Sequence, residues 1–453
     1  MLERIFKLKA HNTSVKTELI AGATTFMVMA YIIAVNPSIL SSVGMDHSAV
    51  LIATCIATFV GTMLMALLAN LPFVISAGMG LNAFFAYTVC EGMGYSWKLA
   101  LLAVFVEGVI FLIIALTPLR SWIADSIPLS LKQAITVGIG LFIAFIGLQN
   151  GGLVVEGSTL VTAVNLRSDF HTSGICALLA VFGIVLAFIF HIKKVPGGLL
   201  FSVLVSWGMG MLCQAVGLYV PNEAAGYASL YPTFGMTDFS TLGETAGALF
   251  RVDFSDVSFF GFVMVIVSFL FVDLYDTMGT LIGVSMKAGM LDEQGRLPAI
   301  RPALASNSIA MMVGSCLGCS TTSPFVESAA GVGAGGRTGL TAITTGFLFL
   351  ASMFFAPIFT SIPSFATAPP LIVVGFLMFS GVTDIKFGEK DWLSAIPAYI
   401  CIIVMPLFYS ISEGISLGVI SYVVLNLVCG KRKNVNPVMI VLALLFLLKY
   451  CFI

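Results

Sequence analysis

Four polar side chains lie inside long apolar runs of this chain, and their types could bind a polar ligand or a proton. Asp273 and Asp276 lie in the run FVDLYDTMGT, Asn82 in SAGMGLNAFF, and Glu327 in TTSPFVESAAGVGAGGRTG. A carboxylate buried at bilayer depth is costly unless it has a partner, so an acid there is a functional hypothesis by default. These residues are the first candidates for a site.

The composition indicates whether these residues lie in a soluble protein or in a lipid bilayer. The chain has 453 residues, of which 59% are hydrophobic and 9% charged, with a mean hydropathy of +1.06. Soluble domains carry about 25% charged residues. We therefore expect an all-α polytopic membrane protein, integral to a bilayer, without a cleaved signal peptide at its short basic N-terminus.

Hydropathy predicts about fourteen crossings of ~20 residues each. The expected spans cover 17–36, 49–69, 73–90, 98–117, 132–149, 172–191, 197–218, 257–284, 303–318, 321–335, 339–357, 368–383, 392–409 and 413–429. With the N-terminus in the cytoplasm, 17 Lys and Arg residues fall on the cytoplasmic side and 3 outside. This asymmetry follows the positive-inside rule and supports the span count.

The spans divide into two halves of seven. The first repeat is expected over 1–219 and the second over 257–430, and residues 431–453 form a basic loop and an apolar segment. Residues 434–453 are either a fifteenth span or a helix lying against the bundle or the interface. The second alternative is favoured because Lys449 and the chain end would sit poorly in the opposite leaflet.

Spans three and ten are too short or too broken for straight crossing helices. Each opens with a β-prone stretch and continues as a small-residue helix, and the two occupy corresponding positions in the halves. Paired interrupted segments point to a transporter site built from inverted repeats. Both contain PFVxSA, at 72–77 and 324–329, which is a possible trace of the repeat. The dense glycine of GVGAGG is expected to permit close helix packing.

The polar residues have chemical roles that follow from their types. Asp273 and Asp276 are three residues apart and share a helix face, where they can accept ligand N–H groups or hold a proton. The alternative is a structural pair bonded to neighbouring hydroxyls. Glu327 opens the half-helix of span ten, where it either binds ligand or caps its own helix. The amide of Asn82 can donate and accept at once, which suits the edge of a heterocycle, or it packs on a facing helix.

Other residues carry weaker signals. Glu107 within span four either bonds a neighbouring helix or takes part in coupling, and Asn36 either stops span one or lines the cleft. Cys316 and Cys319 form a CxxC without a second pair or a nearby histidine, so no metal site is expected. The four histidines lie near span ends or loops, and no nucleophile–base set is visible, so we expect neither an enzyme nor a cofactor.

At these residues the chain resembles the AzgA-like guanine/hypoxanthine permeases of the nucleobase:cation symporter (nucleobase–ascorbate transporter) superfamily. The resemblance covers nearly the whole chain, through TELIAGATTFMVMAYIIAVNP, SAGMGLNAFFAYTV, FVDLYDTMGT, SPFVESAAGVGAGGRTGLTA and ISEGISLGVISYVV. It implies two inverted seven-span repeats with short strands in spans three and ten. It also implies a core domain from spans 1–4 and 8–11 and a gate domain from spans 5–7 and 12–14.

The resemblance assigns roles by motif. Asn82 matches the essential asparagine of span three, and Asp273 the span-eight acid that bonds the purine. Asp276 matches the second acid needed for transport, and Glu327 the span-ten acid that recognises the base. These three acids are also the candidates for proton coupling.

By looser alignment, backbone amides near Phe84 and Val326 would complete the purine-binding edge. The resemblance thus implies import of hypoxanthine and guanine by cation symport, with a proton preferred over sodium, across a bacterial plasma (inner) membrane. A homodimer is plausible, and no nucleic acid partner is expected. The alternatives are an adenine-preferring permease or an anion transporter of the same fold; a channel and a membrane enzyme fit the residues less well.

Overall fold

The computed structural model is almost entirely helical and describes residues 2–117, 128–157, 161–167, 169–222, 226–253, 259–292, 296–388 and 391–452. Ten helical segments in this part of the chain are long and apolar enough to cross a membrane. The helices α13 and α18 and two strand–helix segments complete the fourteen expected crossings. Residues 257 and 258, with which the eighth expected span begins, lie outside the described residues.

The described elements of the first half begin with a short N-terminal helix and end with α10. They are α1 (Leu2–Phe6), α2 (Val15–Met29), α3 (Ile32–Ser41), α4 (His47–Leu64), η1 (Met65–Ala69), β1 (Ile75–Ala77), α5 (Met79–Ala83), η2 (Phe84–Gly92), α6 (Trp97–Leu116), α8 (Leu129–Asn150), β2 (Val154–Glu156), β3 (Val161–Ala163), η3 (Phe170–Gly174), α9 (Ile175–Ile192) and α10 (Gly198–Ala215). Local sequence sets several starts: the side chains of Asp46 and Ser96 cap α4 and α6 by accepting from Ala49 N and Leu99 N.

The second half follows a loop that carries η5 (Phe239–Thr241), α11 (Leu242–Thr245) and η6 (Ala248–Phe250). Its elements are α12 (Phe259–Ala288), α13 (Ile300–Leu317), β4 (Thr322–Pro324), α14 (Ser328–Gly333), α15 (Gly339–Ser352), η7 (Met353–Phe355), α16 (Ala356–Thr360), α17 (Ser364–Phe379), η8 (Ser380–Asp384), α18 (Trp392–Leu407), α19 (Ile411–Val428), η10 (Arg432–Asn434) and α20 (Pro437–Phe452).

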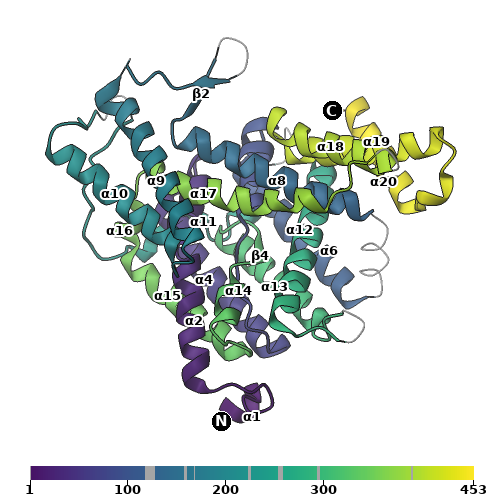
Figure 1. Cartoon of the computed structure of the whole chain (residues 1–453), viewed down its shortest axis with the longest axis horizontal. Helices are drawn as coiled ribbons and strands as arrows, with labels where there is room; N and C mark the ends of the chain where they lie inside the picture. The colour runs from purple at the N-terminus through teal and green to yellow at the C-terminus, as the bar shows by residue number, and fades with distance from the viewer. Residues whose placement is uncertain are drawn as a thin grey trace.

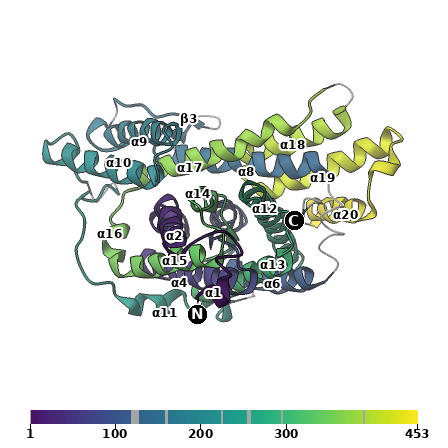
Figure 2. The same cartoon turned by 60° about the horizontal axis from the view of Figure 1, so that its bottom comes forward.

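The helices form two groups, a core and a gate. In each group, the contacts made by helices of one half recur between the corresponding helices of the other half. In the core, α15 packs on α4 and α2, and correspondingly α6 packs on α13 and α12. In the gate, α8 and α17 pack on each other, while α17 contacts α9 and α10 and α8 contacts α18 and α19. Figure 2 shows the gate helices along the top, with the core helices below them. In Figure 1, α8 and α17 run across the direction of α2.

The two broken spans meet through their strands, as the sequence predicts. β1 and β4 pair antiparallel, with Ser76 opposite Ser323. The shared PFVxSA, however, is not a trace of the repeat. The last three residues of its first copy form β1, whereas the first residue of its second copy ends β4. The two copies are therefore out of register with respect to the strands, and the similarity does not reflect equivalent positions.

Close packing explains part of the dense glycine of span ten. A Cβ built on Gly331 would lie 2.8 Å from the carbonyl oxygen of Ala21 on α2, and one built on Gly336 would lie 2.9 Å from Ala21 Cβ. Any side chain at these two positions would push α14 away from α2. Gly333 has no atom within 4 Å of such a Cβ, so the expected close approach holds for two glycines and not for this one.

The C-terminal helix α20 packs along α19. The hydroxyl of Tyr422 on α19 donates to Asn434 O just before α20, and at the far end the Tyr450 hydroxyl donates to the Glu413 carboxylate. At 16 residues α20 is as long as α18, which is counted among the crossings. Whether α20 is a fifteenth span or a helix at the interface therefore stays a prediction, as do the residue limits of the three predicted regions.

Candidate functional site

The site lies where α12 passes the paired strands. Asp273 lies near the middle of α12 and is fully buried. Its carboxylate accepts two hydrogen bonds, from Thr277 Oγ1 and from Asn307 Nδ2 of α13, each 3.1 Å long. Asn307 also donates to Thr277 Oγ1 at 3.1 Å. This part of the acid pair is bonded to neighbouring polar groups, as its structural interpretation expects.

Asp276 lies one turn further along and faces the second broken span. Its carboxylate interacts electrostatically with the side chain of Ser323 in β4 and with Glu327. Unlike Asp273, it is partly exposed. Both members of the expected pair lie on α12: the inner one, Asp273, is bonded to α13, and the outer one, Asp276, faces the strand crossing.

Glu327 lies immediately before α14 and is also partly exposed. Its Oε1 accepts a 3.0 Å hydrogen bond from the hydroxyl of Tyr31, and its neighbour Val326 is 54% exposed. Tyr31 itself is fully buried and lies at the break between α2 and α3. Sequence reasoning missed Tyr31, although a tyrosine within an apolar span signals a hydroxyl that needs a buried partner.

Asn82 belongs to a second group of hydrogen-bonded side chains. On α5, its amide nitrogen donates to Asn36 Oδ1, and its amide oxygen accepts from Thr321 Oγ1 at 3.1 Å. Asn36 in turn donates to Thr54 Oγ1 at 2.8 Å. The asparagine thus ties α3, α5 and the entry to β4 together, and one of its two N–H groups has no partner among the described residues. Asn36 joins this network rather than ending its helix, because α3 continues to Ser41.

The first turns of the span-three helix are packed against α12. Phe84 is fully buried, and its ring meets Phe269 edge-on, with centroids 4.8 Å apart. Its ring therefore fills the core, and its part in a binding edge would be limited to its backbone. Immediately after α5 the helix winds as a π-helix over η2, and π-turns occur frequently at functional sites.

Glu107 is a further buried acid and lies close to Asp273. It lies on α6, is fully buried, and interacts electrostatically with Asp273. Neither carboxyl oxygen has a hydrogen-bond partner among the described residues. The sequence left its role open between bonding a neighbouring helix and coupling, and the first of these is not seen.

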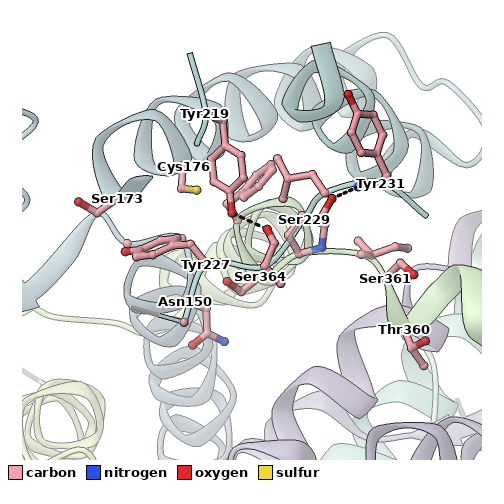
Figure 3. A pocket seen from close by; sticks show the side chains of 18 of the residues that line it. Asn150, Ser173, Cys176, Tyr219, Tyr227, Ser229, Tyr231, Thr360, Ser361 and Ser364 are labelled. Atoms are coloured by element: carbon pink, nitrogen blue, oxygen red, sulfur yellow. Dashed lines mark hydrogen bonds between the residues drawn. The ribbon is translucent and has the colours of Figure 1, made fainter. Parts of the chain in front are cut away.

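A well-defined pocket lies elsewhere in the described part of the chain. A pocket of about 610 Å³ lies among α9, the segment after α10 and the start of α17, and Figure 3 shows Tyr219, Tyr227, Asn150 and Ser364 around it. None of its described lining residues is charged. Because the acids lie outside it, we place the candidate site at the strand crossing and not in this pocket. In the described part of the chain, no group of three or more His, Cys, Asp or Glu residues is arranged to hold a metal.

Comparison with known proteins agrees with this geometry. The model of the Permease family, Xan_ur_permease, matches residues 16–417. The chain belongs to this family. This permease is therefore a membrane transport protein and not an enzyme, as predicted.

Two curated relatives cover this permease almost completely. It is 42% identical over 455 residues to the guanine/hypoxanthine permease PbuO of Bacillus subtilis, covering 98% of this chain and 99% of the relative. It is 40% identical over 454 residues to the adenine permease AdeP of Escherichia coli, covering 100% and 96%.

A solved structure confirms the fold. The transmembrane domain of the cyanobacterium bicarbonate transporter BicA matches with a TM-score of 0.59 and 14% identity, over 88% of this chain and 97% of that one. At this identity the likeness concerns the fold and not the substrate.

Proposed function

We propose that this permease imports the 6-oxopurines hypoxanthine and guanine by proton symport across a bacterial inner membrane, with its N-terminus in the cytoplasm. Glu327 and Asp273 accept N–H groups of the purine, Asn82 bonds its carbonyl or a ring nitrogen, and Asp276 is the second acid of the site. Backbone amides near Val326 and Phe84 complete the edge. The core then moves against the gate and exposes the site to each side in turn.

The observation that carries this proposal is the convergence of Asp276, Glu327 and Tyr31 at the strand crossing. Two partly exposed carboxylates stand there at the inner end of a broken span. Guanine presents two N–H donors on one planar edge, at N1 and at its amino group, and hypoxanthine presents the N1–H there; these donors match carboxylate acceptors. To reach the buried Asp273, a purine N–H would replace the Thr277 hydroxyl that now bonds it.

An adenine permease is the second candidate, because AdeP is nearly as similar to this chain as PbuO. Adenine carries an exocyclic amine, a donor, where hypoxanthine and guanine carry an oxygen, an acceptor. A site built to bond one of these groups leaves a buried polar atom unpaired with the other, which can discriminate strongly. The amide and hydroxyl groups near the acids can donate or accept a hydrogen bond, so they fit the amine of adenine as well as the oxygen of hypoxanthine and guanine.

The test is uptake of labelled hypoxanthine by cells that lack purine uptake and express this chain. Excess unlabelled guanine, adenine, uracil or sulfate is added as competitor, with and without a proton uncoupler. We expect guanine to compete and the uncoupler to abolish accumulation. Glu327→Gln should reduce uptake at least tenfold, because a neutral amide replaces an acceptor of charge-assisted hydrogen bonds worth about 1.5–3 kcal/mol.

Glu244→Gln is the matched control, since Glu244 is an exposed acid on α11. It should transport as the unsubstituted chain does. Competition by adenine and not by guanine would move the permease to the second candidate. Inserted protein that takes up no base, or a Glu327→Gln variant with full uptake, would contradict the proposed site.

A further inference from the structure

Glu107 is the buried acid that the proposed binding site does not use. The residue after it, Gly108, lies against α13, where a Cβ would come within 3.4 Å of Ser308 O and 2.9 Å of Met312 Cγ. This contact places the middle of α6 directly beside Asn307 and its neighbours. Glu107 thus lies in the buried interface between α6 and α13.

Of the elements packed against α6, one helix, α12, brings an ionisable side chain close to Glu107. The elements that contact α6 are α13, α12, η6 and η2. From α12, Asp273 acts electrostatically on Glu107. The described ionisable side chains of α13, Arg301 and Cys316, lie toward its ends, and η2 carries Tyr87, Cys90 and Glu91. No described cation offsets the charge of Glu107, whose one electrostatic partner is another acid.

The acids form a row whose members interact electrostatically. Glu107 interacts with Asp273, Asp273 with Asp276, and Asp276 with Glu327 at the strand crossing. The Thr277 hydroxyl donates a hydrogen bond to Asp273. One further polar atom, Asn307 Oδ1, is buried without a hydrogen-bond partner among the described residues. Three buried acceptor atoms, the two carboxyl oxygens of Glu107 and Asn307 Oδ1, therefore lack donors among the described residues at the inner end of the row.

An ionised carboxylate without partners is very unfavourable in such a place, whereas the neutral acid is tolerated. A protonated Glu107 carries no charge and gains one O–H donor, the group that this corner lacks. The bland alternative, a glutamate that bonds a neighbouring helix, requires a partner that the described residues do not supply. The surroundings of Glu107 therefore favour a proton-binding role over a structural one.

We propose that Glu107 is the proton-binding site of the transport cycle, connected to the purine site by Asp273 and Asp276. This inference rests on the proposed symport. In the transfer, the O–H bond of one carboxylic acid breaks as a new O–H bond forms on the next carboxylate. One proton enters at Glu327 and leaves by the same row, so protons and charge balance over the cycle.

The test uses the full chain, purified and reconstituted in liposomes, with Glu107→Gln. Exchange of labelled for unlabelled hypoxanthine across the membrane needs purine binding and the conformational change, but no net proton movement. Accumulation driven by an inward pH gradient needs both. A gradient of about one unit supports about tenfold accumulation at one proton per purine. A trapped pH-sensitive dye reports proton entry at the same time.

For Glu107→Gln we expect exchange to persist while gradient-driven accumulation falls about tenfold, to equilibrium, and purine-dependent proton entry disappears. Glu244→Gln should match the unsubstituted chain in all three readouts. Full accumulation with proton entry in Glu107→Gln would overturn the inference and leave the proposed function standing. Loss of exchange in folded Glu107→Gln would overturn it too, because it would assign Glu107 to general structure.

A second variant covers failure of Glu107→Gln to fold. Glu107→Asp keeps a carboxyl group but withdraws it by one methylene, so it should retain coupling with a shifted pH dependence of accumulation. An unchanged pH profile in Glu107→Asp would overturn the proposal. Accumulation by the unsubstituted chain on a sodium gradient and not on a pH gradient would also overturn it. Absence of any purine transport would overturn the proposed function and this inference with it.

Discussion

Two glutamates of this permease, Glu18 and Glu107, are both fully shielded from solvent, yet their surroundings are opposite. Glu18 on α2 accepts from the backbone N–H groups of Arg337 at 2.9 Å, Thr338 at 3.3 Å and Thr341 at 3.1 Å. The Thr341 hydroxyl adds a 2.6 Å bond. Glu107 on α6 has no hydrogen-bond partner among the described residues and lies beside another acid.

The difference separates two uses of a buried acid. The carboxylate of Glu18 closes the N-terminal turn of α15, where free N–H groups and the helix dipole favour negative charge. It ties the first span of one half to the eleventh span of the other. Glu107 anchors no neighbour among the described residues, so stability does not account for its burial, whereas the proton-binding role proposed above would. A residue type and its burial therefore do not tell the two uses apart, but the list of partners does.

The largest effect is expected from Glu18→Ala. This change leaves three backbone N–H groups and one hydroxyl of the α15 start without their acceptor in a buried place. We expect a loss of about 3–5 kcal/mol of unfolding free energy, as found when one partner of a buried charged interaction is removed. The measurement is the unfolding midpoint of the purified protein in detergent, together with the amount of inserted protein.

Glu18→Gln is its graded control. The amide oxygen keeps part of the acceptor capacity but carries no charge, so its loss should be smaller than that of Glu18→Ala. If both variants unfold at the midpoint of the unsubstituted chain, Glu18 is not an anchor and the comparison fails on that side.

A smaller effect is expected from Thr341→Val, which removes the hydroxyl at 2.6 Å from Glu18 and keeps the shape of the side chain. One hydrogen bond to a charged group is worth about 1.5–3 kcal/mol, so the unfolding midpoint should fall by less than in Glu18→Ala. Thr24→Val is the control on α2, because the Thr24 hydroxyl bonds only the carbonyl of Ile20 on its own helix. Equal midpoints in both variants would show that the charge of Glu18 is held by backbone groups alone.

The sequence predicts the acids and the broken spans because these signals are local. A carboxylate inside an apolar run and a glycine-interrupted, β-prone stretch are visible in a window of about ten residues. Asp273, Asp276 and Glu327 therefore emerge without a structure, as does the meeting of spans three and ten. The PFVxSA similarity misleads for the same reason: six matching letters carry no register, and the strands fix a different one.

The partners could not be predicted, because they are distant along the chain. Tyr31 reaches Glu327 across 296 positions, and Glu18 reaches Thr341 across 323. Asn82 shows the same limit. Its amide suits a ligand edge, but in the fold its oxygen accepts from Thr321 and one of its N–H groups donates to Asn36. Three-dimensional pairing decides which polar side chains are left for a ligand, and a single sequence does not contain it.

The smallest effect on stability is expected at Glu107, where the comparison is tested most sharply. Glu107→Met keeps nearly the same volume and replaces an unpartnered acid by an apolar side chain, so no hydrogen bond is lost. Because an unpaired buried polar group costs about 1–3 kcal/mol, the unfolding free energy should stay the same or rise slightly. The midpoint in detergent measures this, and gradient-driven accumulation in liposomes should be lost in the same preparation. A stability loss as large as that of Glu18→Ala would mean that Glu107 is held by groups of the protein after all, and the distinction between an anchoring and a proton-binding glutamate would disappear.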